Sequence, residues 1–310
     1  MRVLLAGATG AIGVPLVRAL TGAGHRVVAL VRDPGKHDLV RGLGAEPVTA
    51  DVMERDALLR AVEGMTADAV LHEATALRGA APRLKVDDPT NALRHTGTEN
   101  LLAAARAVGA RRLVTQSMIL GYGYADHGDR VLTESDAFGL PRRSYADTVV
   151  AGCESTEQQA FGAGDVEGVA LRYGLFYGPR AFSDMFADLM RKRRPCVPTG
   201  GGGTNCWIHV DDAARATVAA LERGRPGHAY NIVDGEPVTW REFAAAVAAA
   251  HGTPPPRAMP RSLLRLGAPY LACLMADTSM RVSNAKAREE LGWQPSYGSL
   301  SEGLAAPPPG

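Results

Sequence analysis

The sequence predicts an α/β fold, a doubly wound parallel sheet with a smaller C-terminal cap. Short apolar runs with the length of buried strands recur in the first half of the chain, at 2–6, 26–31, 47–50, 68–74, 111–117 and 168–174. Stretches with helical spacing of apolar residues lie between them, at 11–24, 54–64, 98–109 and 149–161. Buried strands that alternate with amphipathic helices are typical of parallel βαβ units, in which helices cover both faces of one sheet.

The chain of 310 residues is long enough for this sheet and a second, smaller unit. We assign residues 1–175 to the sheet domain, because the regular alternation ends near Tyr177. A helical stretch at 211–222 indicates that parts of 205–233 return to the same domain. The rest is expected to form the cap and its connections, at 176–205 and 234–305, with a proline-rich linker at 252–260 and a disordered tail at 306–310.

Composition argues against several classes of partner. The formal net charge is +1, from 34 basic and 33 acidic residues, so we expect neither a nucleic-acid nor a membrane-surface partner. The four cysteines form no C-x-x-C pair, which argues against a zinc site or a disulfide framework and favours the reducing cytoplasm. No apolar run has the length of a signal peptide or a membrane span. We therefore expect a cytoplasmic protein without a metal, as a monomer or a homodimer.

The first strand ends in a glycine-rich turn, GATGAIG, before the first helix. Its glycines allow a tight backbone turn and a close approach to a diphosphate, which the N–H groups at the helix start can bind. A plain tight turn can have the same composition, but the position at the start of a βαβ unit favours a dinucleotide. The expected cofactor contacts in this turn are Gly7, Thr9, Gly10, Ala11, Ile12 and Gly13.

The end of the second strand indicates which dinucleotide binds. A carboxylate at this position binds the ribose 2′-OH of NAD, whereas an arginine suits the 2′-phosphate of NADP. Here the strand ends in Val31-Arg32, with Lys36 nearby. We therefore expect NADP(H) to be preferred over NAD(H), with Arg32 as the selective contact. The alternative is that Arg32 is a solvated surface residue and that Asp33 meets the ribose.

Stretches along nearly the whole chain resemble, in the same order, the extended short-chain dehydrogenases/reductases of the NAD-dependent epimerase/dehydratase type. Besides the glycine turn they are Asp51-Val52, HEAT at 72–75, TGTENLLAAA, LRYGLFYGP at 171–179, WIHVDDAARA at 207–216, YNIVDGEPVTWREF and AREELGWQP. The resemblance implies a Rossmann fold but no particular substrate, because the fold hosts many functions. The cofactor contacts that it adds are Asp51, Val52, Ala74, Thr75, Tyr173, Gly174, Leu175 and Phe176.

The chemistry of the family that the chain resembles rests on a Ser or Thr, a Tyr and a Lys. Ser117 is the only hydroxyl at the end of the fifth strand, so it is the candidate to hydrogen-bond the reacting carbonyl oxygen. Counting back from Tyr122 instead places Met118 at that position, and a strand-end hydroxyl can also cap a loop. The fourth helix departs from the family as well, because Arg94 replaces an asparagine.

The Tyr-Lys pair is missing in both possible registers. If Tyr145 is the tyrosine, the lysine position four residues later is Val149. If Glu154 sets the register, the tyrosine position is Ala146 and the lysine position is Val150. No lysine occurs between residues 85 and 192, so no shift of register restores the pair. Tyr145 is therefore a doubtful general acid, because no lysine lowers its pKa from about 10.

The cap is expected to bind the substrate. Its apolar side chains include Phe182, Met185, Phe186, Met190, Leu263, Leu266, Leu271, Leu274, Met275 and Met280. Such a surface suits a large apolar ligand better than a sugar nucleotide, although the same residues at helical spacing also fit an ordinary core. The basic run at 191–194 fits either a diphosphate contact or a solvated helix end, and His209 is expected to be structural.

Three functions remain open from the sequence. A reductase needs a nicotinamide placed against a carbonyl, and its proton can come from water, another side chain or the substrate. A non-catalytic nucleotide sensor fits the missing lysine, and a nucleotide-sugar epimerase or dehydratase depends most on the missing tyrosine base. Because the nicotinamide loop is intact, the sequence favours an NADPH-dependent ketoreductase acting on an aromatic ketone. In lacking the Tyr-Lys pair, the chain resembles the atypical ketoreductases of aromatic polyketide pathways.

Overall fold

The computed structural model describes residues 1–76, 88–141 and 146–306. These residues form a seven-stranded sheet with the order β12-β7-β5-β4-β1-β2-β3, in which every pair is parallel. The strands are β1 (Arg2–Ala6), β2 (Arg26–Val31), β3 (Glu46–Thr49), β4 (Ala69–His72), β5 (Arg112–Met118), β7 (Glu167–Tyr173) and β12 (His228–Ile232). The predicted doubly wound parallel sheet is confirmed. The strand order reverses between β1 and β4, the position at which such sheets bind ligands.

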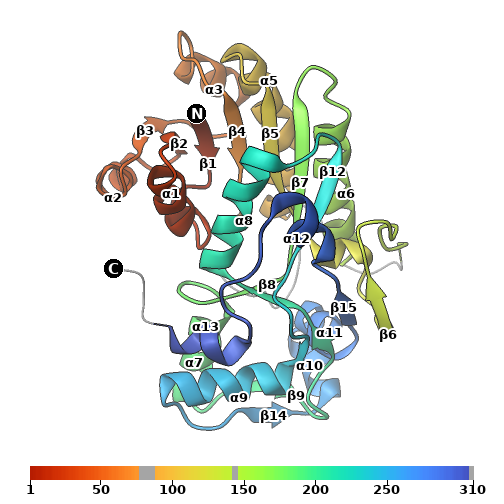
Figure 1. Ribbon diagram of the computed structural model, residues 1–310. Coiled ribbons are helices and arrows are strands. Elements are labelled where there is room, and N and C mark those ends of the chain that lie inside the picture. The colour runs from red at the N-terminus through yellow and green to blue at the C-terminus, as the bar shows by residue number, and fades with distance from the viewer. Residues whose placement is uncertain (77–87, 142–145, 307–310) are drawn as a thin grey trace.

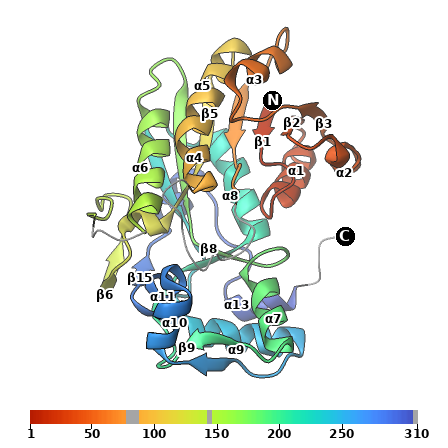
Figure 2. The same cartoon turned by 180° about the vertical axis from the view of Figure 1, so that it is seen from behind.

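Helices cover both faces of this sheet. Figure 1 shows α1 and α8 in front of the strands, and Figure 2 shows α3, α5 and α6 on the opposite face. Successive strand residues point to opposite layers, so Leu5 packs with α1 and α8 whereas Leu4 packs with α3 and α5. The bounds are α1 (Gly13–Gly22), α3 (Arg55–Ala61), α5 (Thr98–Ala107), α6 (Asp147–Phe161) and α8 (Val210–Arg223), and α2 (His37–Gly42) follows β2.

One part of the range 234–305, which the sequence assigned to the cap, lies against the sheet domain. Helix α12 (Ala285–Leu291) packs on α8 and β12, in front of the sheet in Figure 1. Leu291 and Trp293 are buried in the same apolar cluster as the α1 and α8 side chains. The indole Nε1 of Trp293 donates to the carbonyl oxygen of Asp212 at 3.2 Å, which fixes this return segment on α8.

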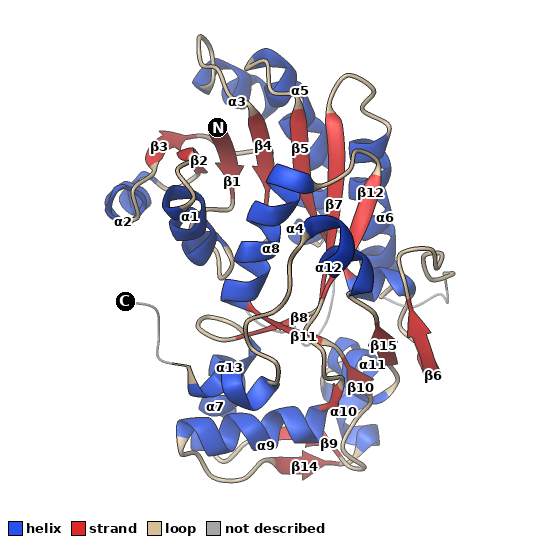
Figure 3. Ribbon diagram, in the orientation of Figure 1, coloured by secondary structure: helices blue, strands red, loops and turns tan. Residues whose placement is uncertain are grey.

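The cap lies below the carboxyl ends of the sheet in Figure 3 and combines short helices with two-residue to four-residue strands. Its helices are α7 (Phe182–Arg191), α9 (Trp240–His251), α10 (Arg261–Gly267), α11 (Pro269–Ala276) and α13 (Leu300–Ala305). Its strands are β9 (Pro195–Pro198), β10 (Thr204–Asn205), β13 (Val238–Thr239) and β14 (Arg257–Met259). Two parallel pairs, β8 with β11 and β6 with β15, join it to the sheet domain, through β6 (Asp126–Leu132), β8 (Leu175–Tyr177), β11 (Trp207–His209) and β15 (Ser279–Val282).

The predicted linker at 252–260 is wrong in its second half. Residues 257–259 form β14, which pairs in parallel with β9, and the N–H of Thr199 donates to the carbonyl oxygen of Met259 at 2.8 Å. The preceding prolines favour an extended backbone, which continues into a strand as readily as into a linker. Strand β9 begins and ends with proline, and β14 directly follows three prolines; in a sheet of only two strands a missing N–H is tolerated.

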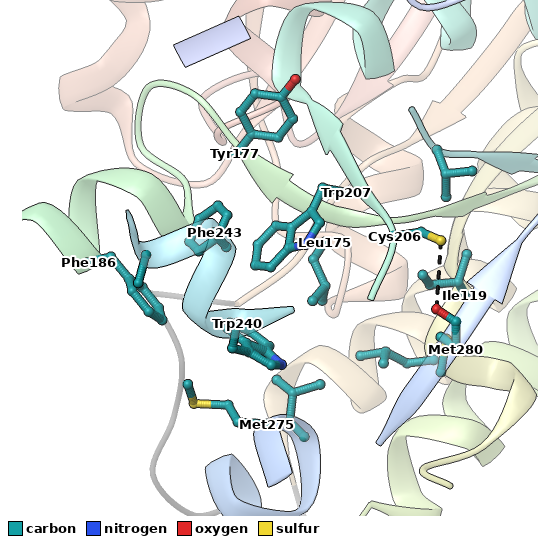
Figure 4. Close-up of a cluster of buried hydrophobic side chains, with 14 of the residues drawn as sticks. Ile119, Leu175, Tyr177, Phe186, Cys206, Trp207, Trp240, Phe243, Met275 and Met280 are labelled. Atoms are coloured by element: carbon teal, nitrogen blue, oxygen red, sulfur yellow. Dashed lines mark hydrogen bonds between the residues drawn. The ribbon is translucent and has the colours of Figure 1, made fainter. Parts of the chain in front are cut away.

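An aromatic cluster forms the centre of the cap (Figure 4). The rings of Trp207 and Phe243 stack with centroids 3.7 Å apart, and Trp240 meets Trp207 edge-on at 5.0 Å. Five of the ten apolar cap residues singled out in the sequence belong to this buried core, and three more are partly buried and pack against it. The five are Phe186, Met190, Leu274, Met275 and Met280, and the three are Phe182, Met185 and Leu271. Leu263 and Leu266, in contrast, are exposed on α10. The ordinary-core interpretation therefore holds for a large part of the set.

Two other polar features have structural roles. The basic run 191–194 is exposed at the end of α7, and Arg191 pairs with Asp188 at 2.9 Å, as expected for a solvated helix end. His209 is buried, and its Nδ1 accepts from the N–H of Asp211 at 3.2 Å, which caps α8. Within the described residues, no helix has the length and hydropathy needed to cross a membrane.

Candidate active site

The turn between β1 and α1 is built so tightly that only glycine fits at two of its positions. Gly7 has φ = +100°, and a Cβ there would lie 2.5 Å from the backbone carbonyl of Glu73. A Cβ at Gly13 would lie 2.0 Å from the carbonyl oxygen of Gly7. No side chain in the described part of the chain caps the start of α1 at Ile12, although the N–H of Val14 already donates to the carbonyl oxygen of Gly10 at 3.3 Å. This turn fits the diphosphate of a dinucleotide.

The side chains at the end of β2 distinguish the two possible ribose contacts. The guanidinium of Arg32 is largely exposed and lies 4.0 Å from a carboxylate oxygen of Asp51. Asp33 instead accepts a hydrogen bond from the N–H of Gly35 at 3.0 Å, which caps the short helical turn Pro34–Lys36. One oxygen of Asp33 is thus already engaged locally, whereas the Arg32 side chain is in solvent. Val52, the neighbour of Asp51, is buried, and its carbonyl accepts from Asn100 at 2.9 Å.

A buried carboxyl group lies at the end of β4, beside the glycine turn. Glu73 is 6% exposed, and burial raises its pKa from 4.5 to about 8, so it is protonated at neutral pH. The hydroxyl of Tyr173 donates to its Oε1 at 2.9 Å and also contacts Thr217 at 2.7 Å. Oε2 of Glu73 has no hydrogen-bond partner among the described residues. The HEAT stretch thus places a neutral acid, rather than an anion, at this edge of the sheet.

A cavity of about 220 Å³ lies between the carboxyl edge of the sheet and the cap. The predicted cofactor residues that line it are Gly10, Ala11, Ile12, Thr75, Tyr173, Leu175 and Phe176. The cap contributes Phe182, Met185, Tyr270 and Leu274. Gly174 is not in the lining, and a Cβ there would lie 2.9 Å from the carbonyl oxygen of Cys206, so tight packing explains this glycine. The cavity therefore joins the glycine turn to an apolar, partly aromatic surface.

The residues expected to handle the proton are divided by the structure. Ser117 lines the cavity, is fully buried, and its Oγ has no partner among the described residues. Met118, which takes the serine position if the count starts from Tyr122, also lines the cavity. On α6 the side that faces the cavity carries Val149, whereas Val150 is buried outside the lining. Tyr145 lies outside the described residues.

Three polar residues of the cavity were missed or given no role by the sequence reasoning. Glu73 was read only as part of a loop, Arg94 only as a departure from the family, and Tyr270 not at all. Arg94 is 2% exposed and comes from a π-helical segment, Leu93–Gly97, that follows α4 (Pro89–Ala92). Tyr270 shares a hydrogen bond of 2.9 Å with Tyr124. The helical spacing of Arg94 with the buried residues of α5 was the one signal that could have indicated its burial.

A second cavity of about 440 Å³ lies inside the cap and shares Phe182 and Met185 with the first. Its other lining residues are mainly apolar and include Leu189, Val197, Trp240, Leu271 and Met275. The described residues contain no cluster of three or more His, Cys, Asp or Glu side chains that could hold a metal ion.

Comparison with known proteins agrees with this geometry. The profile of the NAD dependent epimerase/dehydratase family matches residues 3–233. A 3-diazoavenalumate denitrifying reductase from a Streptomyces species is 38% identical, over 98% of this chain and 99% of its own length. A 4-hydroxy-2-methyl-3-oxo-4-farnesyl-3,4-dihydroquinoline-1-oxide ketoreductase from Stigmatella aurantiaca is 32% identical, over 94% of this chain and 92% of its own. The structure of a Thermus thermophilus UDP-glucose 4-epimerase in complex with NAD matches with a TM-score of 0.77 and 27% identity, covering 98% and 97% of the two chains.

Proposed function

Since the chain belongs to the NAD dependent epimerase/dehydratase family and is a reductase by its named relatives, we propose that it is an NADPH-dependent ketoreductase for a large, mostly apolar aromatic ketone. The observation that carries this proposal is the shared cavity. Residues of the glycine turn line the same space as Phe182 and Met185 of the cap, together with Tyr173, Leu175 and Phe176 at the junction of β7 and β8. A planar apolar substrate in this space would lie against the cofactor loop.

The preference for NADPH rests on Arg32. Its guanidinium is exposed at the end of β2, where it can form charge-assisted bonds to a 2′-phosphate. The glycine turn and the α1 N-terminus would hold the diphosphate, and Tyr173 to Phe176 would flank the nicotinamide, which supplies the hydride when bound.

The proton would come from the substrate. Val149 faces the cavity where a lysine would be needed, and no lysine is present among the described lining residues. When a hydride adds to the carbonyl carbon, the π pair moves to the oxygen, whose charge must be met as it develops. A phenol next to the ketone can transfer its proton to that oxygen and become a phenolate, which water reprotonates after release. Its pKa of about 10 equals that of a free tyrosine, and its geometry is fixed. Ser117 would be at most a second donor.

This chemistry resembles that expected for the angucyclinone C-7 ketoreductase of simocyclinone biosynthesis, so an aromatic polyketide in antibiotic biosynthesis is the proposed substrate class. The cap supports it, because Phe182, Met185 and Leu274 present apolar and polarisable atoms to the cavity. We also propose a cytoplasmic location and a monomer or homodimer; the four free cysteines are compatible with a reducing compartment.

A second candidate is reductive removal of a diazo group. It is favoured by the Streptomyces relative, whose name states that activity and which matches nearly the whole chain. Hydride added to an aryl diazonium gives an aryl diazene, which loses N₂ and keeps the hydrogen on the ring. No alkoxide forms, so this reaction also needs no Tyr-Lys pair.

Incubation with NADPH and a panel of substrates tests the proposal. The panel contains hydroxyaryl ketones, hydroxyquinones, an aryl diazonium salt and sugar nucleotides, and the loss of NADPH absorbance is followed. Oxidation with the ketones or quinones supports the proposal, whereas oxidation with the diazonium salt alone supports the second candidate. Turnover of sugar nucleotides alone, or tight NADPH binding with no turnover at all, indicates an epimerase-type enzyme or a sensor and contradicts it.

A further inference from the structure

Arg94 is a buried cation without an anionic partner among the described residues. Its side chain donates to Oδ1 of Asn91 at 3.4 Å and to Oε1 of Gln116 at 3.5 Å, both neutral groups at long distances. Its Nε has no partner among the described residues. A buried charge with such weak compensation is costly, because desolvation is not offset by an ion pair. A site of this kind is stabilised when a ligand brings the missing negative charge.

The two carboxyl groups that line the cavity, of Glu73 and Asp88, form no ion pair with Arg94 in the described structure. Glu73 is protonated at neutral pH, because burial raises its pKa to about 8. Asp88 accepts from the N–H groups of Thr90 and Asn91, at 2.9 and 3.3 Å, and so caps α4. The cavity therefore offers Arg94 as a cation for an anion that enters from outside.

Arg94 also lies beside α6, the helix that carries both positions at which the lysine was expected. It packs against α6 at Gly152, where an added Cβ would lie 3.3 Å from Cδ of Arg94 and 2.7 Å from Oδ1 of Asn91. Val149, which occupies one lysine position, is one helical turn earlier and lines the same cavity. The positive charge of Arg94 also lowers the pKa values of Tyr124 and Tyr270, against the larger opposite effect of burial. The cavity beside α6 thus receives a positive charge from Arg94, which belongs to the segment Leu93–Gly97 and not to α6.

We propose that Arg94 binds a phenol oxygen of the substrate in its anionic form. The inference rests on the proposed function, because it identifies the phenolate left after substrate-assisted protonation as the ligand of Arg94. In the step described above, the phenol O–H bond breaks as the new alcohol O–H bond forms, and the electron pair stays on the phenol oxygen. Arg94 then pairs with that oxygen inside the cavity, where the guanidinium forms charge-assisted hydrogen bonds. Arg94 would thus lower the pKa of the substrate phenol, as the lysine of the family lowers the pKa of its tyrosine.

A chromogenic phenol tests the inference without any hydride transfer. 4-Nitrophenol is titrated with the protein saturated with NADP⁺, and absorbance reports the ratio of phenolate to phenol in the bound fraction at fixed pH. The bound ratio is expected to exceed the free ratio by at least about tenfold, which corresponds to one unit of pKa. Arg94→Lys should keep part of this increase, and Arg94→Met should abolish it. The control Arg60→Met removes an equal charge from an exposed position on α3 and should keep the full increase.

Thermal unfolding separates this role from a structural one. Arg94→Met replaces a buried unpaired charge by an apolar chain of similar length, so its Tm is expected to equal or exceed that of the parent. Absence of 4-nitrophenol binding, an unchanged phenolate ratio in the parent, or a ratio that survives in Arg94→Met would overturn the inference. A parent protein that shifts the ratio but never oxidises NADPH keeps the inference and rejects the ketoreductase, so the two failures are distinguishable.

Discussion

The turn between β1 and α1 and the cavity wall between β5 and α6 follow different rules. In the turn, function depends on backbone: a Cβ at Gly7 would meet the backbone of Glu73, and a Cβ at Gly13 would meet the backbone of the turn itself, so no side chain fits. In the wall, function depends on side chains, and Val149 lines the cavity at one of the two positions expected for the lysine. The comparison teaches that packing fixes the half of the site that holds the cofactor. The half that handles the proton can change its residues without changing the fold.

The largest effect on cofactor binding is expected when a glycine of the turn is replaced by a residue with a side chain. Gly13→Ala places a Cβ 2.0 Å from the carbonyl oxygen of Gly7, so the turn must open and lose its fit to the diphosphate. We expect the Kd for NADPH to rise about 100-fold or more, together with a lower Tm. Gly22→Ala, on the same helix, is the matched control, because a Cβ there meets no described atom within 4 Å. A Gly13→Ala protein that binds NADPH like the Gly22→Ala protein contradicts the role given to the turn.

The next effect is cofactor selection. Arg32→Ala should remove most of the preference for NADPH over NADH, which we expect to be about 1.5–3 kcal/mol from charge-assisted contacts. The two dissociation constants are measured by fluorescence titration for both proteins. Lys36→Ala is the comparison, because its charge is nearby but not at the strand end. Equal affinities for the two cofactors in the parent protein disprove the preference.

The pH dependence of stability should reveal Glu73. Its pKa is about 8 in the folded chain and 4.5 ordinarily, so between these values the folded state holds a proton that the unfolded state has lost. The free energy of unfolding therefore falls as the pH rises through this window. Glu73→Gln does not titrate and can still accept from Tyr173. The variant should come close to the parent near pH 5 and exceed its stability at about pH 9 by roughly 4 kcal/mol, since one pKa unit corresponds to about 1.4 kcal/mol.

Denaturant unfolding at several pH values measures this difference. Asp234, whose pKa burial also raises to about 8, stays in both proteins and cancels in the comparison. Ionisation of Glu73 above pH 8 should also weaken NADPH binding in the parent but not in Glu73→Gln, because the carboxylate would repel the diphosphate. Parallel stability curves for the two proteins would show that Glu73 keeps an ordinary pKa.

The smallest effect is expected at Tyr145. No lysine activates it, so Tyr145→Phe should keep kcat within about tenfold of the parent, far from the 10²–10⁴ typical of a general acid. Steady-state rates with the best substrate of the panel give the answer, and circular dichroism checks the fold. A thousandfold loss of kcat in a folded variant would restore Tyr145 as the acid.

The sequence predicted the class of the sheet because its signals are local. Buried apolar runs and glycine spacing depend on neighbours within one βαβ unit, and they located six of the seven strands. Strand β12 and the strand order were not predicted, because they depend on which strands pair in the folded chain. The cap was harder, since β14 depends on pairing with β9, about 60 residues earlier in the chain. Its proline-rich approach contains no local signal that separates a strand from a linker.

The proton-handling half was predicted mainly by what is missing. The absence of a lysine between residues 85 and 192 is visible in the sequence. The presence of Arg94 beside Gly152 is not, because it results from the packing of the π-helical segment on α6. Glu73 was equally hidden, since its raised pKa comes from burial that only the folded chain provides. Residues whose chemistry depends on tertiary burial are the ones that sequence reasoning misses.

Two matched substrates test the central claim, that the phenol of the substrate itself supplies the proton, most directly. One is an aromatic ketone with a free phenol beside the carbonyl, and the other is its methyl ether, with binding of both shown by titration. We predict that the free phenol is reduced about 10²–10⁴-fold faster, the usual contribution of a general acid. Equal rates for the two bound substrates would mean that the protein or water supplies the proton, and would contradict the account.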